Sequence, residues 1–323
     1  MMKNFRKIRG QERLVERLQN DISKQQLKHA YLFVGPKGVG KRTLAQAFAK
    51  TILCGNMSER PDACDSCETC QILDHDNHPD FYWMRPEPGK DYRIDAIREM
   101  QKTLSYKPVS GEYRIILLDE TEKLGLTCGN ALLKSIEEPP EGTIFILVSS
   151  SLEGLLSTIV SRCQVMQFSS LSSETVKELF LSDYGLDEKR ASLLAGLSSN
   201  TMEVADYAEQ AQEMLEWLDF SDIDRIIRES PHELWDLSQS LEKQEHIVQI
   251  IGYWRKSLRD SLVRSIDKEI EPMLDRDEPI WEEDYILGAL ELMSEAIRAL
   301  EQRANKRMTV DVLLQKLRKA ATA

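Results

Sequence analysis

The stretch AYLFVGPKGVGKRTLAQAFAKTIL, residues 30–53, decides the fold of this chain. It opens with an apolar run from Ala30 to Val34, which predicts a buried strand. A glycine-rich turn follows at once, and residues 42–53 then return to the apolar spacing that is typical of a helix. A strand, a loop and a helix in this order open an α/β nucleotide-binding domain.

The glycine-rich turn matches the phosphate-binding loop of nucleotide-binding proteins up to the lysine of that motif. The matching residues are Gly35, Gly38, Gly40 and Lys41. In such a loop, backbone N–H groups face a phosphate, the helix N-terminus adds positive potential, and the lysine reaches the terminal phosphates. Because a strand precedes the motif and a helix follows it, a chance match is disfavoured and we expect a nucleotide site.

The position after the lysine departs from the motif. A Ser or Thr there supplies the hydroxyl that holds Mg²⁺, but this chain has Arg42, with Thr43 one place late. A guanidinium cannot ligate a cation, and successive helical residues point about 100° apart, so Thr43 does not simply replace the missing ligand. We therefore expect weak or metal-poor binding of ATP or ADP and little hydrolysis by the isolated chain.

Two further buried strands are predicted at residues 114–118 and 143–149, with a helix from about Asn130 to Glu138 between them. Strands that alternate with helices predict a mainly parallel sheet covered on both faces. Ligands of such sheets gather outside the carboxyl ends of the strands. Asp119 and Ser149 lie at such ends.

The strand that ends in Asp119 and Glu120 has a form typical of a nucleotide hydrolase. The first acid would help to hold Mg²⁺, and the second would polarise the attacking water. Apolar strands that end in two acids are common, so this signal is weak alone. Together with the phosphate loop upstream, it favours a nucleotide site or the remnant of one.

Four of the six cysteines fall within seventeen consecutive positions, spaced x9, x2 and x2. They are Cys54, Cys64, Cys67 and Cys70. Four thiolates complete a closed tetrahedral site of the kind that holds structural Zn²⁺. His75 and His78 lie nearby, but the shell is already complete, so we expect both at the surface. The alternative is a set of thiols without a metal, in which case a chelator would leave the thermal stability of the domain unchanged.

The composition is that of an ordinary folded protein with more than one domain. The chain has 323 residues, of which 41% are hydrophobic and 30% charged. A net charge of −12 argues against a free-standing nucleic-acid binder, because such proteins use excess Lys and Arg to neutralise phosphates. No apolar run approaches the roughly 18 residues that cross a bilayer, so we expect a cytoplasmic protein without membrane contact.

The β-type runs end at about Phe168, after which residues 173–323 show the pattern of amphipathic helices. We expect a first domain at residues 1–168, with the zinc module at 54–70 inside it. A small helical domain is expected at 169–208 and a larger helical domain at 209–323. An exposed connection is expected around Glu271 to Pro279, where prolines flank a charged stretch.

The segment from Thr158 to Cys163 ends in Ser-Arg-Cys, and here the sequence resembles the clamp-loader branch of the AAA+ family. The resemblance implies an AAA+ phosphate-loop sheet with a zinc module, a small helical lid and an all-α collar through which the subunits form a ring. Other matching stretches are Gly10-Gln11, His29 to Tyr31, Asn130 to Lys134, Glu137 to Pro140, Ser149-Ser150 and Ala304 to Arg307.

The resemblance implies that Arg162 is an arginine finger, given in trans to the ATP of the adjacent subunit. A guanidinium aimed at the transferring phosphate stabilises the charge that develops there. A lone surface arginine would more simply form an ordinary ion pair. The surrounding motif favours the finger.

The resemblance also implies partners within bacterial DNA polymerase III. These are the gamma/tau motor subunits and the delta subunit, with the sliding clamp contacted indirectly or weakly and primer-template DNA met through the assembled complex. A motor subunit should carry an intact Gly-Lys-Ser/Thr and a sensor 2 arginine, yet residues 198–203 contain no arginine. These departures favour a stator that helps ATP-dependent clamp loading through its finger.

Two alternatives remain open. The first is an active AAA+ ATPase, either the motor subunit itself or another DNA-processing machine such as a branch-migration helicase; robust turnover by the chain alone would favour it. The second is a nucleotide-independent zinc scaffold whose phosphate loop is vestigial. Failure to bind any nucleotide, together with an Arg162 that can be replaced without effect, would favour the scaffold.

Overall fold

In the computed structural model, the described residues form two compact units, the first up to Thr175 and the second from Val176 onward. The expected helical domains at 169–208 and 209–323 lie partly outside the described residues, and the expected connection at 271–279 lies wholly outside them. The structure describes residues 2–56, 61–87, 90–197, 233–244, 247–266, 282–302 and 304–321.

The first unit is built around a five-stranded sheet in the order β2-β3-β4-β1-β5, and every strand pair is parallel. Val34 pairs with Ser149, and Leu118 with Leu147, so the carboxyl ends of the three central strands lie along one edge. The expected α/β fold is therefore confirmed. The strands are β1 (Ala30–Val34), β2 (Phe81–Met84), β3 (Arg114–Leu118), β4 (Thr143–Ser149) and β5 (Gln164–Gln167).

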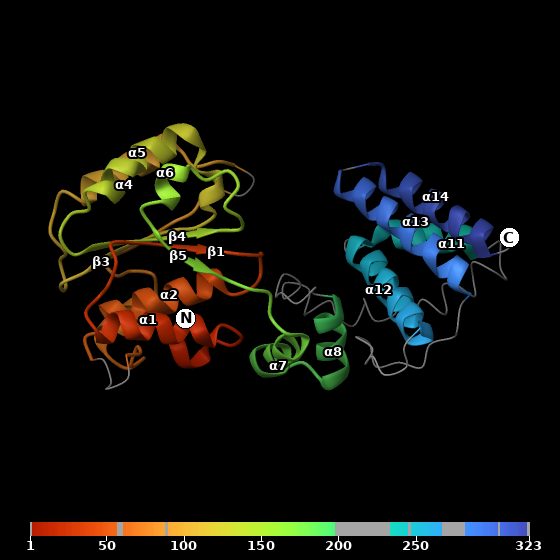
Figure 1. Ribbon diagram of the computed structural model, residues 1–323, viewed down its shortest axis with the longest axis horizontal. Helices are drawn as coiled ribbons and strands as arrows, with labels where there is room; N and C mark the ends of the chain where they lie inside the picture. The colour runs from red at the N-terminus through yellow and green to blue at the C-terminus, as the bar shows by residue number, and fades with distance from the viewer. Residues whose placement is uncertain are drawn as a thin grey trace. The chain divides into compact units, whose positions relative to one another are not determined.

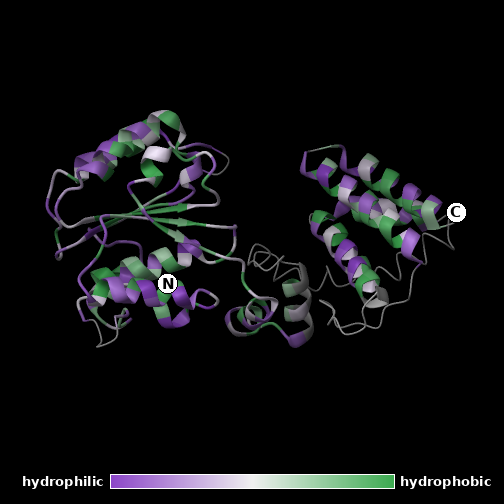
Figure 2. Ribbon diagram, viewed as in Figure 1, coloured by the Kyte–Doolittle hydropathy of each residue, from purple (hydrophilic) through white to green (hydrophobic). Residues whose placement is uncertain are grey.

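Helices cover both faces of this sheet (Figure 1). Figure 2 shows that the strands are hydrophobic while the helices on either side of them carry hydrophilic residues as well. One face is covered by α1 (Glu12–Ser23) and α2 (Lys41–Leu53), and the other by α4 (Ile94–Thr103), α5 (Gly125–Glu137) and α6 (Ser157–Val160).

The alternation of side chains along β1 explains the two layers, because successive residues of a strand point to opposite faces. Tyr31 and Phe33 belong to the core under α1 and α2, where Tyr31 meets Phe48 edge to face with ring centres 5.0 Å apart. Leu32 belongs to the opposite core with Leu132 of α5. Burial on both faces makes these central strands continuous apolar runs.

The two strands that the sequence patterns did not predict are β2 and β5, which form the edges of the sheet. Each has four residues, and only one residue of each is fully buried. A short edge strand is buried less than a central one, so its sequence lacks the long apolar run that indicates a strand. The helix expected from about Asn130 begins earlier, at Gly125.

The second unit is helical in all of its described parts, as expected after Phe168. Trp254 is fully buried at its centre, in a core with Ile250, Met293 and Leu314. No helix in the described ranges combines the length and the apolar character that a membrane span needs. Its helices are α8 (Glu188–Leu197), α11 (Glu233–Lys243), α12 (Ile247–Ile266), α13 (Glu283–Glu301) and α14 (Lys306–Ala321), and α7 (Ser173–Asp183) spans the boundary.

Candidate functional site

The phosphate loop connects β1 to α2 at the carboxyl edge of the sheet. Gly38 and Gly40 have φ of 70° and 89°, a region that favours glycine. At Gly35 a side chain is excluded by close packing, because a Cβ there would lie 2.5 Å from the carbonyl oxygen of Phe168 after β5. The glycines of the motif therefore allow both the backbone geometry of the turn and its close contact with the neighbouring strand.

Lys41 closes this loop from inside. Its ammonium group donates to the carbonyl oxygen of Gly35 at 2.7 Å and to that of Pro36 at 2.5 Å, and the residue is only 7% exposed. The ammonium of the motif lysine thus contacts the backbone of its own loop. A phosphate that entered would have to compete with these two carbonyl groups for the ammonium.

Arg42 contacts the acid at the end of β3. Its Nε donates to Oδ2 of Asp119, a residue that is 3% exposed, and the guanidinium carbon lies 5.8 Å from the ring centre of Trp83. The other carboxylate oxygen of Asp119 accepts from the backbone N–H of Glu120 at 3.0 Å. Half-buried Thr43 follows Arg42 in α2.

These residues do not fit the magnesium ion that a phosphate-loop site ordinarily holds. Mg²⁺ takes oxygen ligands in near-octahedral geometry, typically from a hydroxyl of the loop and an acid on the neighbouring strand. Here a guanidinium replaces the hydroxyl, and that guanidinium already pairs with the acid, Asp119. The set therefore offers no pair of free oxygen ligands at this position.

Glu120, the second acid, lies in the left-handed region with φ of 50° and pairs with Lys123. It is the residue before a short 3-10 helix, η2 (Thr121–Lys123). The carboxylate is partly exposed, and its ion pair is local, within one turn. Its role as a base that polarises water stays a prediction.

Glu122 links the ends of β3 and β4, a contact that sequence patterns did not indicate. Its carboxylate accepts from the hydroxyl of Ser149 at 2.9 Å, and from both the hydroxyl and the N–H of Ser150. Burial would raise the pKa of Glu122, but these hydrogen bonds outweigh it and the pKa is lowered. Ser149 and Ser150, a stretch that matches the clamp-loader pattern, are thereby fixed to the acidic end of the neighbouring strand.

Arg162 lies at the surface after α6. Its Nη2 is 2.7 Å from Oε1 of Glu137, the last residue of α5, and its Nη1 donates to the carbonyl of Thr158 at 3.0 Å. The two side chains of the ion pair are 38% and 44% exposed. An exposed pair of this kind is worth about 0–1 kcal/mol, so the guanidinium can leave Glu137 at little cost.

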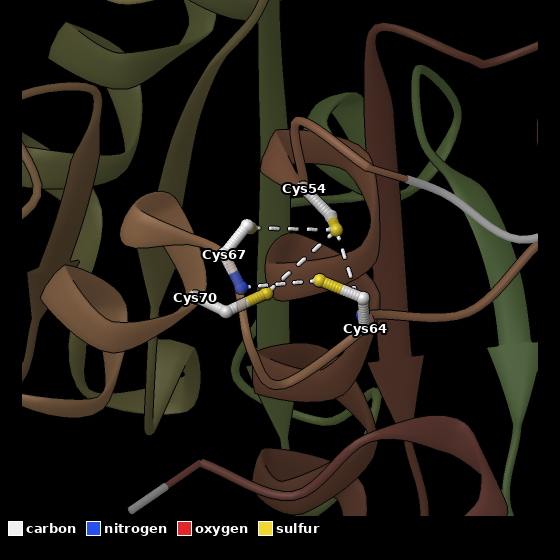
Figure 3. A group of neighbouring side chains, drawn as sticks. All are labelled: Cys54, Cys64, Cys67 and Cys70. Carbon is white, nitrogen blue, oxygen red and sulfur yellow. Dashed lines mark hydrogen bonds between the residues drawn. The ribbon is translucent and has the colours of Figure 1, made fainter.

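The four cysteines converge at the end of α2 and the start of α3 (Glu68–Asp74), as Figure 3 shows. All four sulfur atoms lie within 4.8 Å of one another, with Cys54 3.9 Å from Cys67 and 3.7 Å from Cys70. A tetrahedron with metal–sulfur bonds of about 2.3 Å has sulfur–sulfur edges of about 3.8 Å. The cluster therefore fits a metal ion with four thiolate ligands.

The environments of these thiols differ. Burial raises the pKa of Cys54 and of Cys70, whereas the backbone N–H of Ser66, followed by other hydrogen bonds, lowers the pKa of Cys64 to about 6. Thiolates are the form that binds metal, so a bound ion would keep the buried sulfurs deprotonated.

A buried lysine anchors this four-cysteine module to α2. Lys50 is fully buried, and its Nζ lies 2.7 Å from a carboxylate oxygen of Asp65 and 2.8 Å from one of Asp74. Burial would lower the pKa of Lys50, but the carboxylates of Asp65 and Asp74 raise it overall. Its place on the buried face of α2 is the one sequence signal that could have indicated this role.

The N-terminal segment packs on the same module. Asp62 accepts from the backbone N–H of Phe5 at 2.9 Å and from Nε of Arg6 at 3.0 Å. The backbone N–H of Met2 donates to Asp74. The module is therefore held from two sides, by α2 and by the first residues of the chain.

The prediction for His78 was wrong. His75 is exposed as expected, but His78 is buried, and its Nδ1 accepts from the backbone N–H of Asp80 at 3.1 Å. Burial lowers the pKa of His78, while the nearby carboxylate of Asp80 opposes that change. The imidazole serves the packing before β2. The expected sensor 2 stretch, residues 198–203, lies outside the described residues.

Comparison with known proteins matches residues 10–172 to the family model described as DNA polymerase III, delta subunit. DNA polymerase III subunit delta' of Bacillus subtilis is 31% identical over 196 residues, which cover 61% of this chain and 58% of the relative. The delta' subunit of Pseudomonas aeruginosa is 40% identical over 139 residues, 42% of this chain and 41% of the relative.

A relative named as a tau subunit matches as well. DNA polymerase III subunit tau of Bacillus subtilis is 33% identical over 172 residues, 53% of this chain and 30% of the relative. The chain thus spans less than two thirds of the length of each of these relatives. Among solved structures, a gamma subunit-related protein from Thermotoga maritima has a TM-score of 0.44 at 18% identity, covering 95% of this chain and 99% of that one.

Proposed function

The chain belongs to the family described as DNA polymerase III, delta subunit, and from that premise we propose that it acts as a delta-prime subunit of a bacterial clamp loader. In that role it helps ATP-dependent loading of the sliding clamp onto primed DNA. The observation that supports this function best is at its own phosphate loop, where Arg42 takes the position of the Mg²⁺ ligand and pairs with Asp119. Arg162, by contrast, lies exposed at the surface. Such a chain can assist hydrolysis elsewhere without performing it.

Arg162 is the finger in this proposal. Phosphoryl transfer spreads negative charge over the oxygens of the γ-phosphate, and an arginine brought in from a neighbouring subunit stabilises that charge. The exposed ion pair with Glu137 holds the guanidinium at the surface until the ATP of a motor subunit replaces the carboxylate as its partner. The chain itself then hydrolyses little or no ATP.

The partners in this role are the gamma/tau motor subunits and the delta subunit. The described helices α11 to α14 belong to the proposed collar at residues 209–323, and α7 and α8 to the proposed lid at 169–208. The net charge of −12 supports contact with primer-template DNA through the assembled complex rather than by this chain alone. Contact with the sliding clamp is indirect or weak in this role. The complex works in the cytoplasm.

The metal of the four-cysteine module is Zn²⁺ in this account, and its role is structural. Zinc prefers tetrahedral thiolate sites, and a shell of four cysteines leaves no open position for substrate. The sulfur spacing of 3.7 and 3.9 Å supports that geometry. When bound, the ion would join the end of α2 to α3.

The function is tested by leaving the chain out. A loader is assembled from tau, delta and this chain, and transfer of labelled clamp onto primed DNA is measured with and without the chain. We expect loading to fall to background without it, and the chain alone to show no Mg²⁺-dependent ATP turnover. Equal loading without the chain would refute the role, and robust turnover by the chain alone would favour the motor subunit instead.

A further inference from the structure

The carboxylate of Asp119 already has a cation, and that cation is part of the protein. In a magnesium-dependent phosphate loop the metal lies between the loop hydroxyl and the acid of the neighbouring strand. In this chain the residue at the hydroxyl position is Arg42, and its guanidinium pairs with Asp119 across 77 positions of sequence. The charge that the metal would bring to this acid is supplied by a side chain.

The guanidinium is fixed in place from two sides. Its Nε donates to Asp119, and its carbon lies 5.8 Å from the ring centre of Trp83, close enough for a cation–π contact. A guanidinium has five N–H donors in a planar fork, so one bond to Asp119 leaves others for a second oxyanion. The side chain of Arg42 is 47% exposed, so a ligand can reach those donors.

We propose that Arg42 replaces the magnesium ion of this phosphate loop, so that any nucleoside di- or triphosphate it holds is bound as the free anion, without a divalent cation. Lys41 at the loop and Arg42 beside it together supply two positive charges for the phosphates. A dication added here would meet the guanidinium as a like charge and find Asp119 already neutralised. The inference rests on the proposed function only in taking residues 35–41 as a nucleotide site.

The experiment measures ATP binding to the isolated full-length chain by calorimetry, once with Mg²⁺ and once with EDTA. For the native chain we expect the two dissociation constants to agree within about twofold, because the metal has no ligand set to join. Arg42→Thr restores the hydroxyl and frees Asp119, and we expect this variant to bind ATP at least about tenfold more tightly with Mg²⁺ than with EDTA.

The chain offers a matched control in Arg85, an exposed arginine whose guanidinium carbon lies 5.0 Å from the ring centre of Trp83. Arg85→Thr removes an arginine from the same ring and leaves the pair of Arg42 and Asp119 intact, so it should behave like the native chain. Circular dichroism establishes that each variant is folded, and the native comparison requires no variant.

The outcomes separate clearly. Tenfold tighter binding of Mg²⁺-ATP than of free ATP by the native chain would overturn the inference. If the native chain binds no ATP in either buffer, a gain of magnesium-dependent binding in Arg42→Thr supports the inference, and a folded variant without that gain overturns it. These binding experiments do not test Arg162, whose effect is measured on ATP hydrolysis by a neighbouring subunit. A failure of this inference can therefore be told apart from a failure of the proposed function.

Discussion

Chelation of the zinc ion proposed for the four-cysteine module is expected to lower the melting temperature of the chain by about 10 °C. Structural zinc contributes about 10–16 kcal/mol of apparent binding free energy in small zinc peptides. If only about a third of that is coupled to folding here, the loss is about 4 kcal/mol, which corresponds to ~10 °C for a unit of this size. Thermal melts with and without a zinc chelator, followed by circular dichroism, measure the shift.

The effect should extend beyond the cysteines, because the module is continuous with the phosphate-loop helix. Cys54 caps the C-terminal end of α2, and Lys50 of the same helix is paired with Asp65 of the module and with Asp74, the last residue of α3. Without the metal, Cys54 and Cys70 return to neutral thiols, the form that their burial favours. The order of α2 then depends on its remaining contacts.

A serine variant provides the specific test of this prediction. Cys70→Ser should reproduce the loss of stability and lower the zinc content of the purified chain, measured by mass spectrometry, below one ion per chain. Cys163→Ser, at a half-buried cysteine outside the module, is the control and should retain the metal. If the melting temperature of the native chain did not change with the chelator, the thiols would not be metal ligands.

Lys50→Met is expected to lower the free energy of unfolding by about 3 kcal/mol, because it removes the cation and leaves Asp65 and Asp74 facing each other in a poorly solvated site. Methionine is also unbranched and is one atom shorter than lysine, so most of the loss comes from the charge and little from a cavity. Urea denaturation at neutral pH measures the change. Lys102→Met, at an exposed position of α4, should stay within about 0.5 kcal/mol of the native chain.

Neutralising the acids separates electrostatics from packing. Adding Asp65→Asn and Asp74→Asn to Lys50→Met removes the uncompensated charges, so part of the lost stability should return. If the single lysine variant were as stable as the native chain, the buried pair would not anchor the module. If the triple variant were no better than the single one, the loss would be steric.

The central strands could be predicted from the sequence because their burial on both faces makes them apolar throughout. The runs 30–34, 114–118 and 143–149 became β1, β3 and β4 with the same bounds. The edge strands β2 and β5 could not be predicted, because half-buried residues at a sheet edge carry no continuous pattern. A strand can therefore be predicted from its sequence to the extent that it is buried in the sheet.

Motifs whose residues are close in sequence could be predicted, whereas pairs of residues far apart in sequence could not. The x9, x2 and x2 spacing brings four sulfurs together because short connections force them into one place. The missing hydroxyl at Arg42 could be seen, but its partner Asp119 is 77 positions away and is set by the pairing of strands. The pairs of Lys50 and the burial of His78 depend on tertiary packing in the same way.

The central claim is that Arg162 acts on the ATP of a neighbouring subunit, and the ATPase rate of the assembled loader tests it most directly. The rate is measured with clamp and primed DNA for loaders that contain the native chain, Arg162→Ala or Glu137→Gln, after gel filtration has established that each complex is intact. An arginine finger raises the hydrolysis rate at its site by about 10³-fold or more. Arg162→Ala should therefore abolish hydrolysis at the site that Arg162 faces and leave only the turnover of the other sites. Glu137→Gln removes the partner of the exposed ion pair and keeps the guanidinium, so its rate should not fall. An intact Arg162→Ala loader that hydrolyses ATP as fast as the native one would contradict the account.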